Sequence, residues 1–205
     1  MEKYISKKEK ASYGFAAVGS YMVAGITQSY LMYFFTDILI IPSAFVMMLM
    51  IVARVWDALN DPMMGVIVDR TSTKYGKMRP YVLIGSFLML VTTIVLFMPL
   101  TGAPTMFKMI FAAVSYIIFG MAYTLTDVPA MGLMSVATPN SDERASLLSF
   151  YVTVGSVGSL LPVGLLTIFQ PFIPEKYVYF SMSIFVSIIT SAAYLTLFKN
   201  SKERF

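Results

Sequence analysis

The amino-acid sequence predicts an all-α membrane protein with six transmembrane helices. Hydrophobic residues make up 58% of its 205 residues and charged residues only 13%, and the mean hydropathy is +0.74. Soluble domains are about 45–50% apolar and about 25% charged, so this composition is typical of a chain embedded in a lipid bilayer. The apolar residues also gather in six runs, each near the ~20 residues that a helix needs to cross a bilayer.

The six predicted helices form a single domain over residues 1–205, and they cover residues 12–35, 44–68, 81–100, 107–136, 147–169 and 177–198. Glycine and aromatic residues are frequent in the first helix, as in a close-packed or cavity-lining helix. Pro129 predicts a break in the fourth helix and Pro162 a kink in the fifth, because proline removes a backbone donor. The connections are short and leave no room for a soluble domain.

Lysine and arginine are distributed unequally between the two sides of the predicted bundle. Twelve lie at the termini and in the connections after the second and fourth helices, whereas the opposite connections hold only Lys108 and Lys176. Basic residues favour the cytoplasmic side of a membrane. We therefore expect a multi-pass protein of the cell (plasma or inner) membrane with both termini in the cytoplasm. Because the basic residues flank apolar runs, the net charge of +4 does not indicate nucleic-acid binding.

Charged side chains interrupt the second apolar run. Arg54, Asp57 and Asp61 share one face of a helix, because residues three, four and seven apart stack on the same side. A charge at membrane depth costs at least about 2.5–3.5 kcal/mol, so this face must meet a cavity or a partner. A structural pair between Arg54 and Asp57 is one explanation, but one arginine cannot neutralise two aspartates. The remaining charge, beside the Asn60 carbonyl, suits Na⁺, and protonation of one aspartate is the alternative.

The fourth predicted helix contains a single acidic residue, Asp127. Thr124 and Tyr123 precede it by three and four residues, so both hydroxyls can flank its carboxylate. Pro129 frees a backbone carbonyl nearby, and broken helices beside acids inside the membrane are typical of transport sites. These residues predict a second part of the same site.

The connection between the second and third helices combines acidic and basic residues with glycine and proline. Asp69 and Arg70 end the second helix, and Lys77 and Arg79 precede the third. Charges across two helix ends can hold one conformation, so we interpret them as a conformational latch. A solvated basic loop is the alternative.

Three stretches carry a resemblance: Asp57-x-x-Asn60-Asp61-Pro62-x-Met64-Gly65, then Asp69-Arg70-Thr71 with Tyr75-Gly76-Lys77-Met78-Arg79-Pro80, and Tyr123-Thr124-x-x-Asp127-x-Pro129. Together they resemble the melibiose-permease-like glycoside–pentoside–hexuronide:cation symporter family of the major facilitator superfamily. The resemblance implies a cation-coupled secondary symporter of a glycoside, sugar or uronide.

The resemblance also implies roles for single residues. Its cation ligands correspond to Asp57, Asn60, Asp61 and Thr124, which would bind Na⁺, with H⁺ or Li⁺ as alternatives, and Arg54 would be their charge partner. Its sugar site keeps Asp127, next to Tyr123. Tyr21 and Met131 stand where the family has an acid and an aromatic residue, and the family's arginine of the fifth helix is missing near Val152. A solute other than melibiose is therefore expected.

Members of this family have twelve helices in two halves, whereas this sequence covers six. The resemblance therefore implies the N-terminal half of a major-facilitator-type fold, built from two three-helix inverted repeats, with the C-terminal half absent or supplied by a second chain. The expected partners are a small solute and the lipid bilayer. A non-transporting relative of a transporter, an inactive fragment and an H⁺-coupled symporter of a non-sugar solute are alternatives. Without cysteine or histidine, we expect no enzyme and no cofactor.

Overall fold

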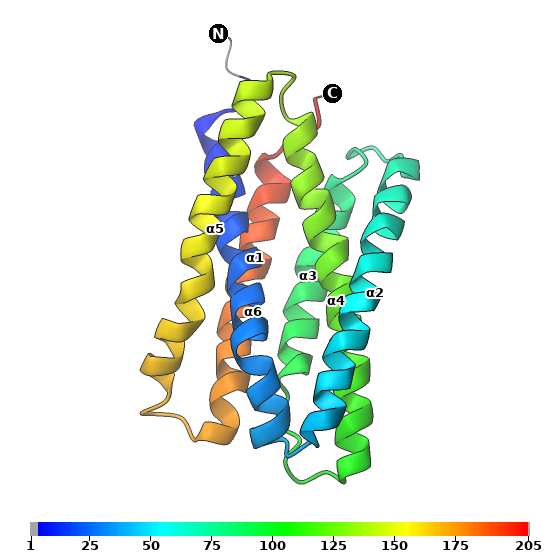
Figure 1. Cartoon of the computed structure of the whole chain (residues 1–205). Helices are drawn as coiled ribbons and strands as arrows, with labels where there is room; N and C mark the ends of the chain where they lie inside the picture. The colour runs from blue at the N-terminus through cyan, green and yellow to red at the C-terminus, as the bar shows by residue number, and fades with distance from the viewer. Residues whose placement is uncertain (1–3, 205) are drawn as a thin grey trace.

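The protein is a bundle of six long helices in a computed structural model, which describes residues 4–204 (Figure 1). The helices are α1 (Lys7–Tyr33), α2 (Ser43–Arg70), α3 (Arg79–Leu96), α4 (Thr105–Val136), α5 (Ser141–Phe169) and α6 (Glu175–Asn200), and a π-helical turn, η1 (Phe34–Ile38), extends α1. The described residues contain no strand beyond an isolated bridge between Thr73 and Gly76. The predicted all-α class is confirmed.

Several helices are longer than the apolar runs that predicted them, because polar residues outside the runs cap them. Ser6 accepts a hydrogen bond from the Glu9 backbone and starts α1, and Asn140 accepts two from the first turn of α5. The predicted break at Pro129 is wrong, since α4 continues through it without interruption. Neighbouring helices in a membrane bundle can satisfy the backbone groups that a proline frees.

The packing of the helices has an internal symmetry. α1 lies against α5 and α6, α4 lies against α2 and α3, and α3 lies against α6. If α1 is exchanged with α4, α2 with α5 and α3 with α6, this pattern of neighbours is unchanged, as two inverted three-helix repeats require. In Figure 1, the counterparts α2 and α5 lie at opposite edges of the bundle. The predicted pair of inverted repeats is confirmed.

Small residues allow α1 to lie close to its neighbours. A Cβ added at Gly25 would lie 2.6 Å from the Ser159 carbonyl oxygen of α5, and one at Gly19 would lie 2.9 Å from the Thr190 Cα of α6. Side chains at either glycine would force the helices apart. The close approach brings α1 against α5 and α6.

Five helices in the described range, α2 to α6, are long and apolar enough to cross a membrane. α1 is not among them, because glycine, serine and tyrosine lower its hydropathy. The start of α1 and the end of α6 lie at the same end of the bundle as the α2–α3 and α4–α5 connections (Figure 1). The basic residues of the termini and of these two connections all belong to this end, apart from Lys3, which lies outside the described residues.

Candidate functional site

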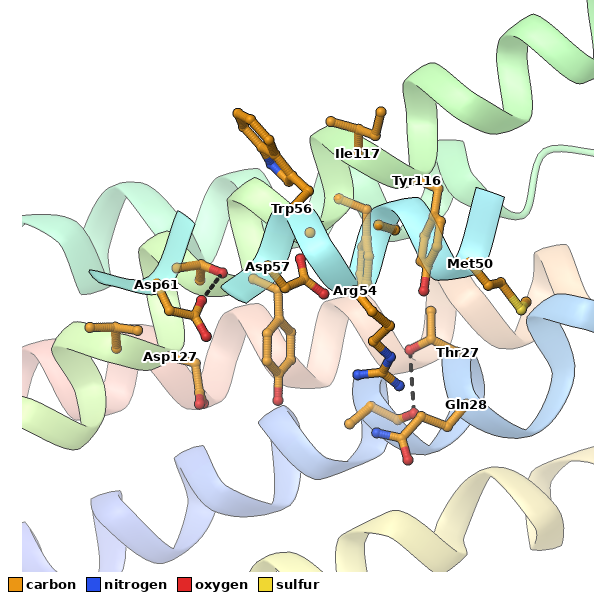
Figure 2. Close-up of a pocket in the computed structure, with 17 residues that line it drawn as sticks. Thr27, Gln28, Met50, Arg54, Trp56, Asp57, Asp61, Tyr116, Ile117 and Asp127 are labelled. Atoms are coloured by element: carbon orange, nitrogen blue, oxygen red, sulfur yellow. Dashed lines mark hydrogen bonds between the residues drawn. The ribbon is translucent and has the colours of Figure 1, made fainter. Parts of the chain in front are cut away.

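A cavity of about 550 Å³ with polar and apolar lining lies between α1, α2 and α4 (Figure 2). Its charged and polar lining comes from all three helices and consists of Thr27, Gln28, Arg54, Trp56, Asp57, Asp61, Tyr116, Tyr123, Thr124 and Asp127. Four of these side chains carry a formal charge, and with one arginine against three aspartates they sum to minus two. A bound cation would reduce this excess of negative charge.

The carboxylates of α2 face the cavity from two successive helical turns. Asp57 and Asp61 both line it, as their spacing predicted. The Thr124 hydroxyl donates a hydrogen bond of 2.8 Å to Asp61 Oδ1, which joins α4 to α2 (Figure 2). Asp57 lies against Gly120, where an added Cβ would be 3.1 Å from Asp57 Oδ1. Asp61 therefore contacts α4 through the Thr124 hydroxyl, and Asp57 contacts it at Gly120, which has no side chain.

Arg54 lines the same cavity without forming an ion pair. Within residues 4–204 the only ion pair joins Glu9 and Arg204. Figure 2 shows the Arg54 side chain extending from α2 toward Thr27 and Gln28 of α1. The structural pair between Arg54 and Asp57, which was one explanation of these charges, is therefore not formed in this conformation. The arginine faces the open cavity instead.

The other residues expected at the cation and solute sites divide into two groups. Tyr123 and Asp127 line the cavity, whereas Asn60, Tyr21 and Met131 do not. Tyr21 packs edge-on against Tyr151 of α5, with ring centroids 6.3 Å apart, and Met131 is exposed on α4. The roles of these three residues stay predictions.

The chemistry available in the cavity is that of hard oxygen ligands. In the described part of the chain, no three acidic side chains lie close enough together to hold a metal ion by themselves. The site instead combines two carboxylates on α2 with a neutral hydroxyl on α4. Few charges and neutral oxygens suit a monovalent cation better than a divalent one, since divalent ions take several carboxylates.

Asp127 is hydrogen-bonded on the side away from α2. Ser20 of α1 donates to its Oδ1 atom at 2.8 Å, and the Tyr194 hydroxyl of α6 approaches the same atom at 3.4 Å. Sequence reasoning missed both residues. Ser20 sits on the polar face of α1, which was a usable signal, but nothing in the sequence of α6 linked Tyr194 to α4.

The four residues expected to form the latch lie at the ends of α2 and α3, but the contacts there are different. The side chains of Asp69, Arg70 and Lys77 form no ion pair with any residue that the structure describes. Instead, the Glu203 carboxylate accepts hydrogen bonds from the backbone N–H groups of Lys77, Met78 and Arg79, at 2.7, 2.9 and 3.0 Å.

Arg79 contributes to this contact from its other side. Its guanidinium donates to the Phe198 carbonyl oxygen at 2.7 Å and lies 4.9 Å from the centroid of the Phe198 ring. Gly76, with φ +103°, completes the turn before α3, and a Cβ there would collide with the Glu203 carboxylate. The end of α6 is thereby fixed to the start of α3.

The residue after Glu203 ties α1 to the same end. The Arg204 guanidinium bonds both carboxylate oxygens of Glu9, at 2.9 and 2.7 Å, and also the Ala137 carbonyl oxygen at 3.1 Å. The Arg204 backbone donates to Val136 at 3.1 Å. Glu9 is only 2% exposed, so this pair is sheltered from water. Hydrogen bonding to Glu9 raises the pKa of Arg204 above its ordinary value.

Known proteins resemble this chain along nearly its whole length. The inner membrane symporter YicJ of Escherichia coli (strain K12) is 34% identical over 77% of this chain and 34% of its own length. The uncharacterized symporter YjmB of Bacillus subtilis (strain 168) is 34% identical over 99% of this chain and 45% of its own length. The isoprimeverose transporter of Lactiplantibacillus pentosus is 28% identical over 96% of this chain and 42% of its own length.

The chain thus spans less than half the length of these curated relatives. Residues 12–205 match the family described as MFS/sugar transport protein, which is a family of transporters rather than enzymes. The match agrees with the six-helix bundle and its inverted repeats, and it confirms the predicted resemblance to symporters of the major facilitator superfamily. The chain belongs to the MFS/sugar transport protein family.

Proposed function

We propose that this chain is the N-terminal half of a cation-coupled sugar symporter and that it provides the cation site. The observation that carries the proposal is the hydrogen bond from Thr124 to Asp61, made inside a cavity that Asp57 also lines. It brings a neutral oxygen of one helix to a carboxylate of another. A cation bound there would have ligands on both α2 and α4, and its release would leave only the hydrogen bond between them.

The coupling ion in this proposal is Na⁺. Arg54 offsets about one of the two charges on α2, and one monovalent cation offsets the other. Two carboxylates one helical turn apart repel each other, and a cation between them would relieve that repulsion. The Thr124 hydroxyl can serve as a neutral oxygen ligand of a metal ion, whereas protonation of a carboxylate requires no such ligand. Asn60 would complete the shell if α2 turned slightly about its axis.

A proton is the second candidate, and one observation favours it. Asn60 does not line the cavity, so a sodium shell in this conformation holds one ligand fewer than the resemblance implies. If Asn60 stays outside the cavity, protonation of Asp57 or Asp61 would remove the excess charge without any further ligand.

The solute in this proposal is a sugar or glycoside that binds beside Asp127 and Tyr123. A cavity of about 550 Å³ falls within the range of about 300–1,000 Å³ that small-molecule sites occupy. Its mixture of aromatic rings, hydroxyls and a carboxylate suits a solute with an apolar face and several hydroxyl groups. One relative is named as a transporter of isoprimeverose.

The remaining wall of the transport pathway would come from a second six-helix half, either in a longer protein or in a second chain. The short coverage of the relatives supports this part of the proposal. The distribution of lysine and arginine supports a cell-membrane protein in which the start of α1 and the end of α6 face the cytoplasm.

Trp56 provides a direct test of the cation site. It is the only tryptophan in the sequence, and it lines the cavity. We would titrate the purified chain in lipid nanodiscs with Na⁺ at constant ionic strength, using K⁺ as the balancing ion, and follow Trp56 emission. A saturable response to Na⁺ is expected.

Asp61→Asn should weaken this response at least about tenfold, which corresponds to about 1.4 kcal/mol of binding free energy. Asp69→Asn is the matched control, since Asp69 lies on the same helix but outside the cavity. A response that follows pH but ignores Na⁺ would assign the site to a proton. Emission that responds to neither ion would reject the proposed cation site.

A further inference from the structure

The carboxylate of Asp127 lies among hydroxyl groups from α1, α4 and α6. Ser20 of α1 donates to Oδ1 at 2.8 Å, and Tyr194 of α6 reaches the same atom at 3.4 Å. The Tyr123 hydroxyl lies 3.2 Å from Ser20 Oγ and so joins the group through the serine. One carboxylate oxygen is therefore held by groups from α1 and α6, and the other has no hydrogen bond with a described residue in these contacts.

Tyr151 of α5 adds a polar group without a partner. Its side chain is 1% exposed, and its hydroxyl has no hydrogen-bond partner among the described residues. It lies near enough to Asp127 and Ser20 to interact with both. A buried hydroxyl normally finds a partner, because leaving it unpaired costs free energy. Tyr151 does not line the cavity, whereas Asp127 does, so a further polar group in the cavity can reach this cluster at Asp127.

The charges around Asp127 restrict what that group can be. Within residues 4–204 no basic side chain forms an ion pair with Asp127. Arg54, the one basic residue lining the cavity, extends toward Thr27 and Gln28 of α1 instead (Figure 2). An anionic group of a solute would meet a carboxylate without a counter-charge, whereas an uncharged hydroxyl would find an acceptor.

We propose that Ser20 and Tyr194 are positioning residues, which hold Asp127 Oδ1 so that the other carboxylate oxygen accepts a hydrogen bond from a hydroxyl of an uncharged sugar. This inference rests on the proposed function, since it concerns the solute end of the same cavity. Tyr123 steadies Ser20 through the contact between their hydroxyl groups. The site selects neutral sugars over uronides at this end of the cavity.

The positioning role is tested by the reactivity of Asp127 in the purified chain, which requires no transport. Dicyclohexylcarbodiimide reacts with protonated carboxyl groups, and hydrogen-bond donors favour the ionised form. Ser20→Ala and Tyr194→Phe should therefore increase labelling of Asp127, measured by peptide mass spectrometry, by about tenfold. Tyr13→Phe is the matched control, because Tyr13 is a buried tyrosine with an unpaired hydroxyl in the same core cluster.

The solute class is tested at saturating Na⁺ by titrating Trp56 emission with isoprimeverose, a neutral disaccharide, and with methyl glucuronide, an anionic sugar. Isoprimeverose should bind at least about tenfold more tightly, and Tyr194→Phe should remove most of that preference while Tyr13→Phe keeps it. The Na⁺ response of both variants should match that of the unaltered chain, which separates this result from a failure of the cation site.

Two results would overturn the inference. Unchanged labelling of Asp127 in both Ser20→Ala and Tyr194→Phe would show that these residues do not hold the carboxylate. Equal or tighter binding of methyl glucuronide, or no binding of isoprimeverose by a chain that still responds to Na⁺, would reject recognition of an uncharged hydroxyl at Asp127.

Discussion

Gly120 of α4 faces Asp57 of α2 so closely that a Cβ added to the glycine would lie 3.1 Å from Asp57 Oδ1. Few real Cβ atoms have a contact as short as this, so the carboxylate would have to move by a few tenths of an ångström. The position of one proposed cation ligand therefore depends on the absence of a side chain on the opposite helix. This dependence can be tested without altering any charged residue.

Gly120→Ala should weaken Na⁺ binding, because it displaces Asp57 while leaving both carboxylates in place. We expect a loss of about threefold to tenfold in affinity from the Trp56 titration, equivalent to about 0.7–1.4 kcal/mol. Gly65→Ala is the control, since nothing lies within 4 Å of a Cβ at Gly65. Unchanged affinity in Gly120→Ala would remove Asp57 from the cation shell.

Thr124→Val should also weaken Na⁺ binding, by about tenfold, because it removes the hydroxyl that joins α4 to Asp61 and keeps the shape of the side chain. Thr126→Val provides the comparison. Thr126 is buried on the same helix, but its hydroxyl bonds back to Ala122 of that helix at 2.7 Å. If the two variants lose affinity equally, the effect comes from altered packing of α4 and not from a lost ligand.

Glu203→Ala should destabilise the bundle, because it leaves three backbone N–H groups at the start of α3 without their acceptor. Loss of a helix cap costs about 0.5–2 kcal/mol. The measurement is the free energy of unfolding in mild detergent, with Lys202→Ala as the control, since Lys202 contributes only its backbone N–H to Glu9. A loss as large in the control would point to a general effect of changing this segment.

Arg204→Met should cost about 3–5 kcal/mol, because it leaves the buried Glu9 carboxylate without its partner. The double variant Glu9→Met, Arg204→Met should recover most of this loss, since neither charge is then buried. A double variant as unstable as Arg204→Met alone would mean that the arginine acts through its bond to the Ala137 carbonyl.

The contribution of Arg204 should not vary with pH between about pH 6 and pH 9. Its pKa is raised in the folded protein by hydrogen bonding to Glu9. A group whose folded pKa lies above its unfolded value contributes fully below the unfolded pKa and loses that contribution only as pH rises through the folded one. Both values lie in strong alkali, so titration of Arg204 should add no pH dependence to the free energy of unfolding of the parent protein across this range.

The fold class followed from composition, because 58% apolar residues and six long apolar runs leave few alternatives to a membrane bundle. The helical period also brought Asp57 and Asp61 to one face, and both line the cavity. How far each helix is rotated about its axis does not follow from periodicity. Asp57 lines the cavity and Asn60 does not because of how α2 is rotated about its axis.

Contacts between distant helices were beyond the reach of the sequence. Ser20 and Tyr194 meet Asp127 from α1 and α6, at separations of 107 and 67 residues, and a polar residue in an apolar helix does not reveal its partner. Pro129 misled for a related reason. The rule that proline breaks helices holds for an isolated helix, whereas packed neighbours stabilise the continuous α4.

The contacts of Glu203 and Arg204 have a consequence for how the bundle moves. α1 and α3 belong to one inverted repeat and α4 and α6 to the other, and these two adjacent residues bond groups from both repeats at one end. Sliding of one repeat past the other would break the Glu203 bonds to α3 and the Arg204 bonds to α1 together. The six helices should therefore tilt as one rigid body, with bending confined to the end of the bundle that holds η1.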